Sequence, residues 1–189
     1  TYLIQAMRDI DAMLVIVGDG PLKESLVEQA KEYGSRIVFL GSKTHEELRR
    51  IYASADIFVM PSITTDDGAK EGFGLVILEA MASGLVVVAS NSGGIPQIVQ
   101  DGVNGLLCEE KDSEQLAYKI GQMLNVNANW EENVRKTVEK YSYSFLVQKY
   151  KEIYYVIWIT VINLFHIIDY YAKVKDIWIS NCYELQKSR

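Results

Sequence analysis

Two glutamates, Glu71 and Glu79, lie eight positions apart in the stretch KEGFGLVILEAMASG at residues 70–84. Glu79 stands among Leu, Ile, Ala and Met in a run that predicts a helix ending at Gly84. Burying an ionised carboxylate without a partner costs roughly several kcal/mol, so such a group is normally paired or hydrogen-bonded. Glu79 therefore needs either a fixed protein partner or a ligand that donates hydrogen bonds to it.

Gly72, Phe73 and Gly74 form the entrance of this predicted helix. Glycines there let another molecule approach the backbone, and the free N–H groups and partial positive charge of a first helical turn suit a phosphate or diphosphate. One turn further along, the Glu79 carboxylate could accept hydrogen bonds from a ribose diol, while Glu71 could hold hydroxyls beyond the other phosphate. A nucleotide sugar has this shape. An ordinary ion pair at Glu79 and ordinary loop glycines are the alternative interpretation.

The segments around this stretch alternate between short apolar runs and helical patterns. Strands are predicted at residues 12–17, 36–41, 56–62 and 85–90 and within 101–108, and helices at residues 2–7, 22–33, 44–52, 112–124 and 129–141. Thr44 and Glu47 have the spacing of a capping box at the start of one helix. The alternation predicts an α/β fold with a Rossmann-like parallel sheet flanked by helices on both faces.

Four loops follow the predicted strands, at Gly18–Pro21, Gly41–Thr44, Ser62–Gly74 and Ser90–Pro96. Parallel α/β sheets bind ligands beyond the carboxyl ends of their strands. We therefore expect these loops to gather at one edge and to form the site. The residues between Ile63 and Lys70 add a polar insertion to the third loop, and it could serve as a lid, a specificity element or a mobile linker.

Several motifs, in order and spacing, resemble the donor-binding C-terminal domain of the retaining GT-B glycosyltransferases, in particular the large family four of sequence classifications. They are LVIVGDGPLKESL, IVFLGSKTHEEL, YASADIFVMPS, EGFGLVILEAMASGLVVVASNSGGIPQIVQDGVNGLL and DSEQLAYKI, and they cover about residues 1–150. Glu71 and Glu79 match the paired glutamates, E-x7-E, of that family. Agreement of several motifs is much stronger than a match to one short pattern.

The resemblance implies a role for each matching position. Glu79 would hold the ribose hydroxyls, and Glu71 would contact hydroxyls of the donor hexose near the reaction centre, which makes it the candidate catalytic residue. The start of the helix would receive the sugar and diphosphate, and the two earlier loops would lie against the nucleotide. The substrate-binding residues expected on this basis are Gly18, Gly20, Ser42, Lys43, Glu71, Gly72, Phe73, Gly74, Leu75, Val76 and Glu79. Neither a metal nor a cofactor is expected.

The implied function is transfer of a hexose, with retention at the anomeric carbon, from a UDP-, GDP- or ADP-hexose to a glycan, lipid-linked or small-molecule acceptor. In the family, a basic pair contacts the diphosphate and an N-terminal domain carries the acceptor site, and neither is matched in this sequence. A leaving nucleoside diphosphate needs such stabilisation. The chain alone is therefore expected to be inactive and to need an acceptor domain in cis or in trans. The alternative is a catalytically incomplete nucleotide-sugar-binding module or half of a split enzyme.

Composition argues against several other classes. A formal net charge of −6 disfavours a nucleic-acid partner. The two cysteines, Cys108 and Cys182, are far apart, which indicates reduced thiols in a cytoplasmic protein. GDGPLKES lacks the glycine spacing of a dinucleotide fingerprint, which disfavours a dehydrogenase. Asp66 and Asp67 have no third ligand nearby in the sequence, so no metal site is expected there.

A change of composition near residue 153 predicts two parts, a donor-binding domain at residues 1–152 and an apolar, aromatic-rich helical tail at residues 153–189. The apolar run in the tail is shorter than the roughly 20 residues that a membrane-spanning helix needs. Docking on protein, a peripheral contact with a membrane and self-association are the roles left open for the tail.

Overall fold

The computed structural model describes residues 1–125, 130–142, 144–145, 148 and 151–153. It divides the chain into two compact units, Thr1–Tyr141 and Ser142–Arg189. All but the first residue of the predicted tail lies outside the described residues, so the predicted boundary after residue 152 and the roles of the tail stay predictions. Within the described residues, no helix is long and apolar enough to cross a membrane.

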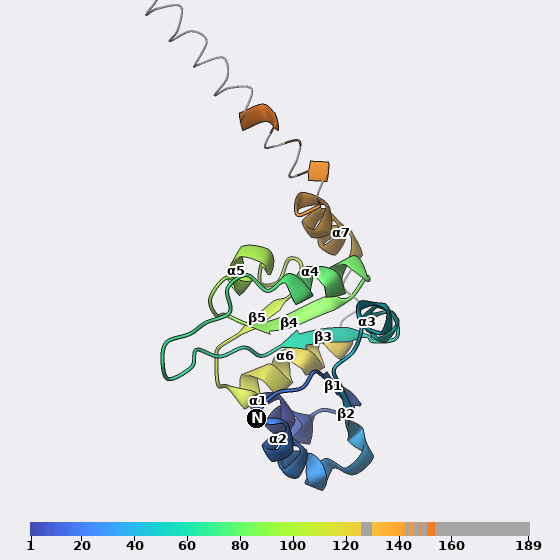
Figure 1. Cartoon of the computed structure of the whole chain (residues 1–189), viewed down its shortest axis with the longest axis vertical. Coiled ribbons are helices and arrows are strands. Elements are labelled where there is room, and N and C mark those ends of the chain that lie inside the picture. Colours follow the sequence, from blue (N-terminus) through green and yellow to red (C-terminus); the bar gives the residue numbers. More distant parts are fainter. Residues whose placement is uncertain (126–129, 143, 146–147, 149–150, 154–189) are drawn as a thin grey trace, which may run out of the picture. The chain divides into compact units, whose positions relative to one another are not determined.

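The first unit alternates strands with helices in the predicted order (Figure 1). Its elements are α1 (Tyr2–Ala6), η1 (Met7–Asp9), β1 (Leu14–Val17), α2 (Lys23–Ala30), η2 (Lys31–Arg36), β2 (Ile37–Gly41), α3 (His45–Tyr52), β3 (Ile57–Met60), α4 (Leu75–Ala82), β4 (Val86–Ser90), α5 (Ile95–Ile98), β5 (Leu106–Cys108), α6 (Ser113–Asn125) and α7 (Glu131–Lys140). Two short 3₁₀ segments extend the first two helices: η1 follows α1 and precedes β1, and η2 follows α2 and precedes β2.

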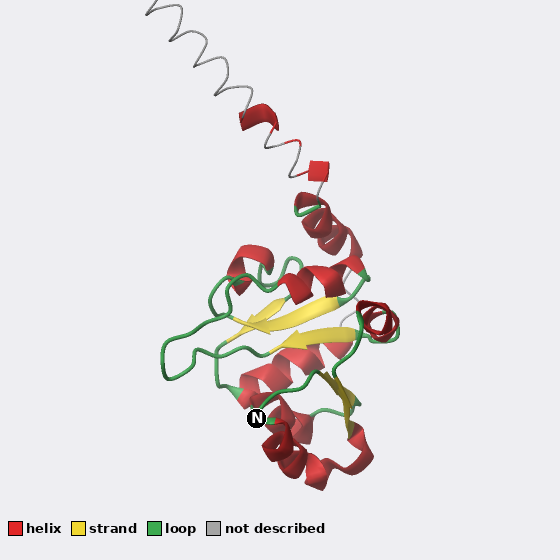
Figure 2. Cartoon of the chain, viewed as in Figure 1, coloured by secondary structure: helices red, strands yellow, loops and turns green. Residues whose placement is uncertain are grey.

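The strands form two parallel sheets rather than the single predicted sheet. β1 pairs with β2, and β4 pairs with both β3 and β5, always in parallel. Among the described residues, β1 forms ladder hydrogen bonds only with β2, and β3 forms them only with β4. The two sheets are therefore separate because β1 and β3 are not paired with each other. Apolar residues of both sheets nevertheless border one core. The predicted class, α/β with parallel strands flanked by helices, is confirmed (Figure 2).

Helices cover both faces of the three-stranded sheet. α6 packs against its strands on one face, with α1 beside α6, and α4 packs on the other face with α7 against it. Val87 and Val88 are both fully buried, and they belong to the cores on opposite faces because successive side chains of a strand alternate. This two-sided cover explains why the sequence of β4 is apolar without alternation.

Two helix ends follow signals that are local in the sequence. α3 starts with the predicted capping box, in which the Glu47 N–H donates to Thr44 Oγ1 and the Thr44 N–H donates to the Glu47 carboxylate. α4 ends just before Gly84, whose φ of +88° is the left-handed conformation that glycine adopts after a helix. Both ends lie where the sequence predicted them.

Candidate functional site

The loops after β1 and β2, at residues 18–21 and 41–44, are tied together and form what we call the β1–β2 loop pair. The Gly18 N–H donates to the Gly41 carbonyl across the two loops (N···O 2.9 Å). Gly18 has a φ of +126°, and Gly20 is exposed. Among the described residues, no atom lies within 4 Å of where a Cβ would stand on either of these two glycines. The pair therefore presents open backbone at the carboxyl end of its sheet.

Asp19 joins the same two loops through its side chain. Its Oδ2 accepts the Ser42 N–H (2.8 Å), and its Oδ1 pairs with the Lys23 ammonium. The hydrogen bonds from Lys23 and then from Ser42 lower the pKa of the Asp19 carboxyl. Lys43 is half-buried, with its ammonium 3.5 Å from a Glu47 oxygen. Ser42 and Lys43 thus lie at the expected edge, and Asp19, which the sequence did not single out, orders the backbone at Ser42.

The loops after β3 and β4, at residues 61–74 and 91–94, form the β3–β4 loop pair and pack backbone against backbone. The Gly94 N–H donates to the Glu71 carbonyl (3.0 Å). A Cβ on Gly93 or on Gly94 would stand 2.1 Å from a backbone oxygen of the facing loop, which no real side chain can do. Sequence reasoning placed this loop at the edge but did not predict these glycines as site residues. The doublet Gly-Gly before Ile-Pro was the available signal.

The Glu71 side chain turns back onto its own loop. Its Oε1 accepts the Gly74 N–H (3.0 Å), and the residue is half-buried. Gly74 has a φ of +80°, a backbone conformation that favours glycine, and a Cβ there would lie 3.1 Å from Ile77 Cδ1, which would have to shift slightly. One N–H that the sequence assigned to a ligand is therefore capped by Glu71 in this structure. A ligand that took this N–H would have to displace the carboxylate.

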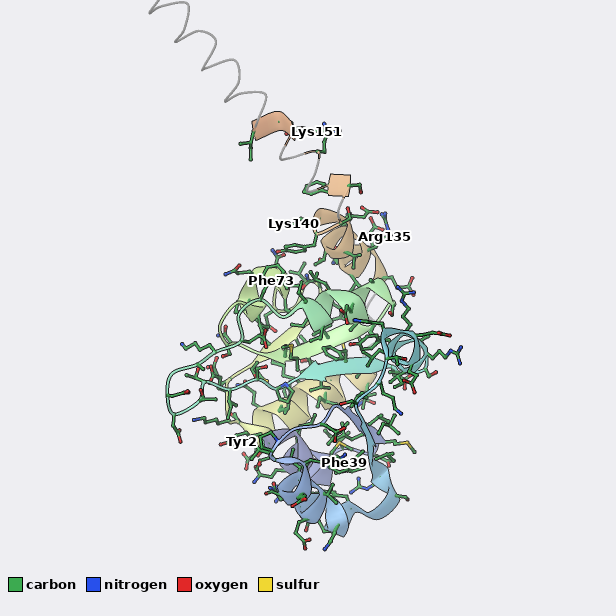
Figure 3. The ribbon with its side chains drawn as sticks, in the orientation of Figure 1. Tyr2, Phe39, Phe73, Arg135, Lys140 and Lys151 are labelled. Atoms are coloured by element: carbon green, nitrogen blue, oxygen red, sulfur yellow. The ribbon has the colours of Figure 1, made fainter. Side chains whose placement is uncertain are left out.

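The start of α4 is open. Leu75 and Val76 are 64% and 40% exposed. The N–H groups of a first helical turn have no carbonyl partner within the helix. Phe73, which is labelled in Figure 3, packs edge-to-face on Tyr141, with ring centroids 5.7 Å apart, and this contact supports the loop from the residue that follows α7. Together with the exposed Gly72, this entrance has the N–H groups and the positive helix end that suit an anion.

Glu79 is exposed rather than buried, which corrects the premise that burial forces a partner on it. Helical geometry places it on the outer face of α4, while Ile77, Ala80 and Met81 take the core positions. Within the described part of the chain, the Glu79 carboxylate makes no hydrogen bond or ion pair, so the fixed Lys or Arg partner of the alternative interpretation is not found. Tyr52 lies close by, and its pKa is raised first by burial and then by the charge of Glu79.

The predicted residues therefore gather in two groups, the β1–β2 loop pair and the β3–β4 loop pair with α4. No hydrogen bond between described residues joins the two groups. A shallow depression of about 530 Å³ lies elsewhere, between η1 and α6, and Asp9, Glu114 and Tyr118 are among the residues that line it. None of the predicted site residues lines this depression.

Two further features bear on chemistry at this edge. Cys108 is buried, and burial raises the pKa of its thiol to about 11, which makes it a structural rather than a reactive cysteine. Asp67 bonds the Thr65 hydroxyl and the Ala69 N–H. Within the described residues there is no group of three His, Cys, Asp or Glu side chains placed to hold a metal. The expectation that no metal takes part stays a prediction.

Parallel strands, helices on both faces and glycine-rich loops at the carboxyl ends define a Rossmann-like α/β domain. Residues 1–144 match the model of the family described as glycosyl transferases group 1. Because the match covers most of the sequence, the chain belongs to that family.

Individual relatives agree with this assignment. The chain is 35% identical over 166 residues to an uncharacterized glycosyltransferase, MJ1607, of Methanocaldococcus jannaschii, which covers 81% of this chain and 40% of the relative. It is 39% identical over 128 residues to a GDP-mannose-dependent phosphatidylinositol monomannoside mannosyltransferase of Mycobacterium tuberculosis, covering 66% of this chain and 33% of that protein. The solved structure of Anabaena HepE in complex with UDP-glucose superimposes with a TM-score of 0.68 and 27% identity, over 82% of this chain and 44% of that one.

Proposed function

We propose that this chain is the C-terminal, donor-binding domain of a retaining GT-B glycosyltransferase of family four, and that it binds a nucleotide-diphosphate hexose across the two loop pairs. The observation that carries the proposal is Glu79, an exposed carboxylate without a protein partner among the described residues, one turn beyond the open start of α4. The likeness to a UDP-glucose complex supports a nucleotide sugar as the ligand.

Each part of the donor has a chemically matched partner in this proposal. The diphosphate binds at the start of α4, where the N–H groups of Leu75 and Val76 and the positive helix end stabilise negative charge. The ribose diol donates to Glu79, which lies on the same outer face. The hexose lies toward Glu71, whose carboxylate leaves the Gly74 N–H when the ligand binds and then accepts hydrogen bonds from sugar hydroxyls.

The nucleotide base lies against the β1–β2 loop pair, where Gly18 and Gly20 present open backbone and Ser42 and Lys43 stand at the rim. Such contacts use mostly backbone groups, so they do not identify which base is bound. The Anabaena structure holds UDP-glucose, and the Mycobacterium relative is named for GDP-mannose. UDP, GDP and ADP are therefore all candidates, and a titration has to choose between them.

Transfer of the hexose is proposed for this domain together with an acceptor domain, in cis or in trans. The chain spans 40% of the M. jannaschii relative and 44% of the Anabaena structure. The acceptor would be a glycan, a lipid-linked molecule or a small molecule, and no metal takes part. A nucleotide-sugar-binding module without transfer activity is the second candidate, because both loop pairs can bind a donor whether or not an acceptor is present.

Calorimetric titration of the full chain with UDP, GDP and ADP and with their glucose or mannose conjugates tests this proposal. We expect one nucleotide to bind and the Glu79→Ala variant to bind it roughly tenfold more weakly or worse, because two hydrogen bonds to a charged group are lost. Glu24→Ala, which removes an exposed carboxylate on α2, is the matched control and should bind like the wild type. Equal affinity of the wild type and Glu79→Ala would contradict the proposed role of Glu79.

A further inference from the structure

The polar insertion between β3 and α4 folds into a hydrogen-bonded turn rather than an extended loop. Both the N–H and the hydroxyl of Thr65 donate to the Ala69 carbonyl (3.0 and 3.1 Å), and the Gly68 N–H donates to the Thr65 carbonyl (2.9 Å). Asp67 also bonds the Thr65 hydroxyl. The turn therefore closes on itself at Ala69, two residues before Glu71.

The base of this turn is held by Glu110, which lies between β5 and α6. One carboxylate oxygen of Glu110 accepts the Thr64 N–H (2.5 Å), and the other accepts the Thr64 hydroxyl (2.8 Å). These two bonds join segments 46 residues apart in sequence. The Ser92 side chain, from the loop after β4, is 3% exposed, and its hydroxyl has no hydrogen bond of standard geometry to any described residue. The Ser92 hydroxyl nevertheless lies close enough to the Glu110 carboxylate to lower its pKa.

Glu71 is thus restrained from two sides. Its carbonyl accepts the Gly94 N–H (3.0 Å), and its N-terminal side is continuous with the turn that Thr64 and Glu110 anchor. We infer that Glu110 is a positioning residue, which holds Glu71 in place through Thr64 and the turn at residues 65–69 so that Glu71 can recognise the donor hexose. This inference rests on the proposed function.

A carboxylate is chemically suited to this position because each of its oxygens accepts one of the two donors of Thr64. Glutamine at position 110 offers one acceptor oxygen, and its NH2 group would face the other donor, so Glu110→Gln should weaken the anchor and Glu110→Ala should remove it. Thr64→Val keeps the N–H bond and loses the hydroxyl bond. Glu109 is the adjacent, exposed carboxylate, and its contact with Asn91 Nδ2 is long, at 3.5 Å, so Glu109→Gln is a matched control.

A positioning role and a merely structural role differ in what they do to the affinity for the preferred nucleoside diphosphate and for its hexose conjugate, for example UDP and UDP-glucose. UDP does not reach Glu71 in the proposed pose, whereas the glucose of UDP-glucose does. Calorimetry on the full chain should therefore show UDP affinity within about twofold of wild type in every variant. UDP-glucose affinity should fall about three- to tenfold in Glu110→Ala, less in Glu110→Gln and Thr64→Val, and not at all in Glu109→Gln. Unchanged UDP-glucose binding in Glu110→Ala, or an equal loss for both ligands, would overturn the inference.

Amide hydrogen exchange without ligand separates failure of this inference from failure of the proposed function. In Glu110→Ala, the amides of Thr65 and Gly68 should exchange at least about tenfold faster than in wild type, while the amide of Ile120 in α6 stays protected. Unchanged exchange in the turn would overturn the anchor whatever the ligand data show. Faster exchange in a chain that binds none of UDP, GDP, ADP and their hexose conjugates would leave the anchor standing but overturn both hexose positioning and the proposed donor.

Discussion

The two loop pairs at the proposed donor site are built in different ways. The β1–β2 loop pair is joined by one backbone hydrogen bond and by the exposed side chain of Asp19, and Gly20 has open space around it. The β3–β4 loop pair is joined by backbone packed on backbone, with no room for a Cβ at Gly93 or Gly94. From this packing we expect the first pair to adjust to a ligand at little cost and the second pair to be more rigid. Rigidity would then be greatest beside Glu71, where the proposed chemistry needs accurate placement.

Substitution of one glycine in each loop pair should give the largest difference in stability between the two pairs. Gly94→Ala would bring a Cβ to within 2.1 Å of a backbone oxygen, so the facing loops must separate. We therefore expect a loss of about 1–3 kcal/mol in the free energy of unfolding, together with a loss of donor binding. Gly20→Ala has open space, and its effect on stability should stay within about 0.5 kcal/mol. Urea unfolding measures both. Similar losses in the two variants would remove the distinction between the pairs.

Acid should release the anchor of the second pair. The Ser92 hydroxyl, then the N–H and hydroxyl of Thr64, lower the pKa of Glu110 from 4.5 to about 2. A carboxyl with a lowered folded-state pKa contributes stability in full above its ordinary value and loses it as the pH falls toward the lowered one. The difference in urea midpoint between wild type and Glu110→Gln should therefore be constant above about pH 5 and should shrink progressively below it.

A difference in urea midpoint between wild type and Glu110→Gln that stays constant from neutral pH down to about pH 3 would contradict this expectation. Lys70 also acts on Glu110 through its charge, so Lys70→Gln serves as a control that should leave the direction of the change intact. Comparison with Glu110→Gln at each pH removes the effect of the other carboxyl groups, which titrate in both proteins.

The smallest effect is expected at Asp19. Asp19→Asn keeps an oxygen that can accept the Ser42 N–H but loses the charge that pairs with Lys23. Because the pair is exposed, nucleotide affinity should fall only about two- to fivefold, and thermal stability should change little. Calorimetry with the nucleotide that the wild type prefers measures this. A loss as large as that of Gly94→Ala would show that the β1–β2 loop pair is as rigid as its counterpart.

Local features of this fold were predictable from the sequence because they depend on neighbouring residues. The capping box of Thr44 and Glu47 and the helix end before Gly84 rest on spacings of a few residues. The alternation of strands and helices likewise predicted the α/β class and the edge where the loops lie. The separation of the strands into two sheets was not predictable, since hydrophobic periodicity says nothing of which strands share a ladder.

The site was predictable only in part, because some of its features are tertiary. Glu79 was expected to be buried among apolar neighbours, but in LVILEAMA nearly every position is apolar, so the sequence does not mark which face of α4 is outward. The backbone contact between Gly94 and Glu71 and the pairing of Glu110 with Thr64 join segments far apart in the chain. No local pattern encodes either contact.

In the proposed complex, the donor binds along the carboxyl-end loops, with its diphosphate at the start of α4. The most direct test is NMR of the isotopically labelled full chain during titration with UDP-glucose, with UDP alone as the comparison. The amides of Leu75, Val76 and Gly18 should shift with both ligands, and the amide of Glu71 should shift further with UDP-glucose. Shifts centred instead on Tyr118 and Glu114, in the depression between η1 and α6, would contradict this proposal.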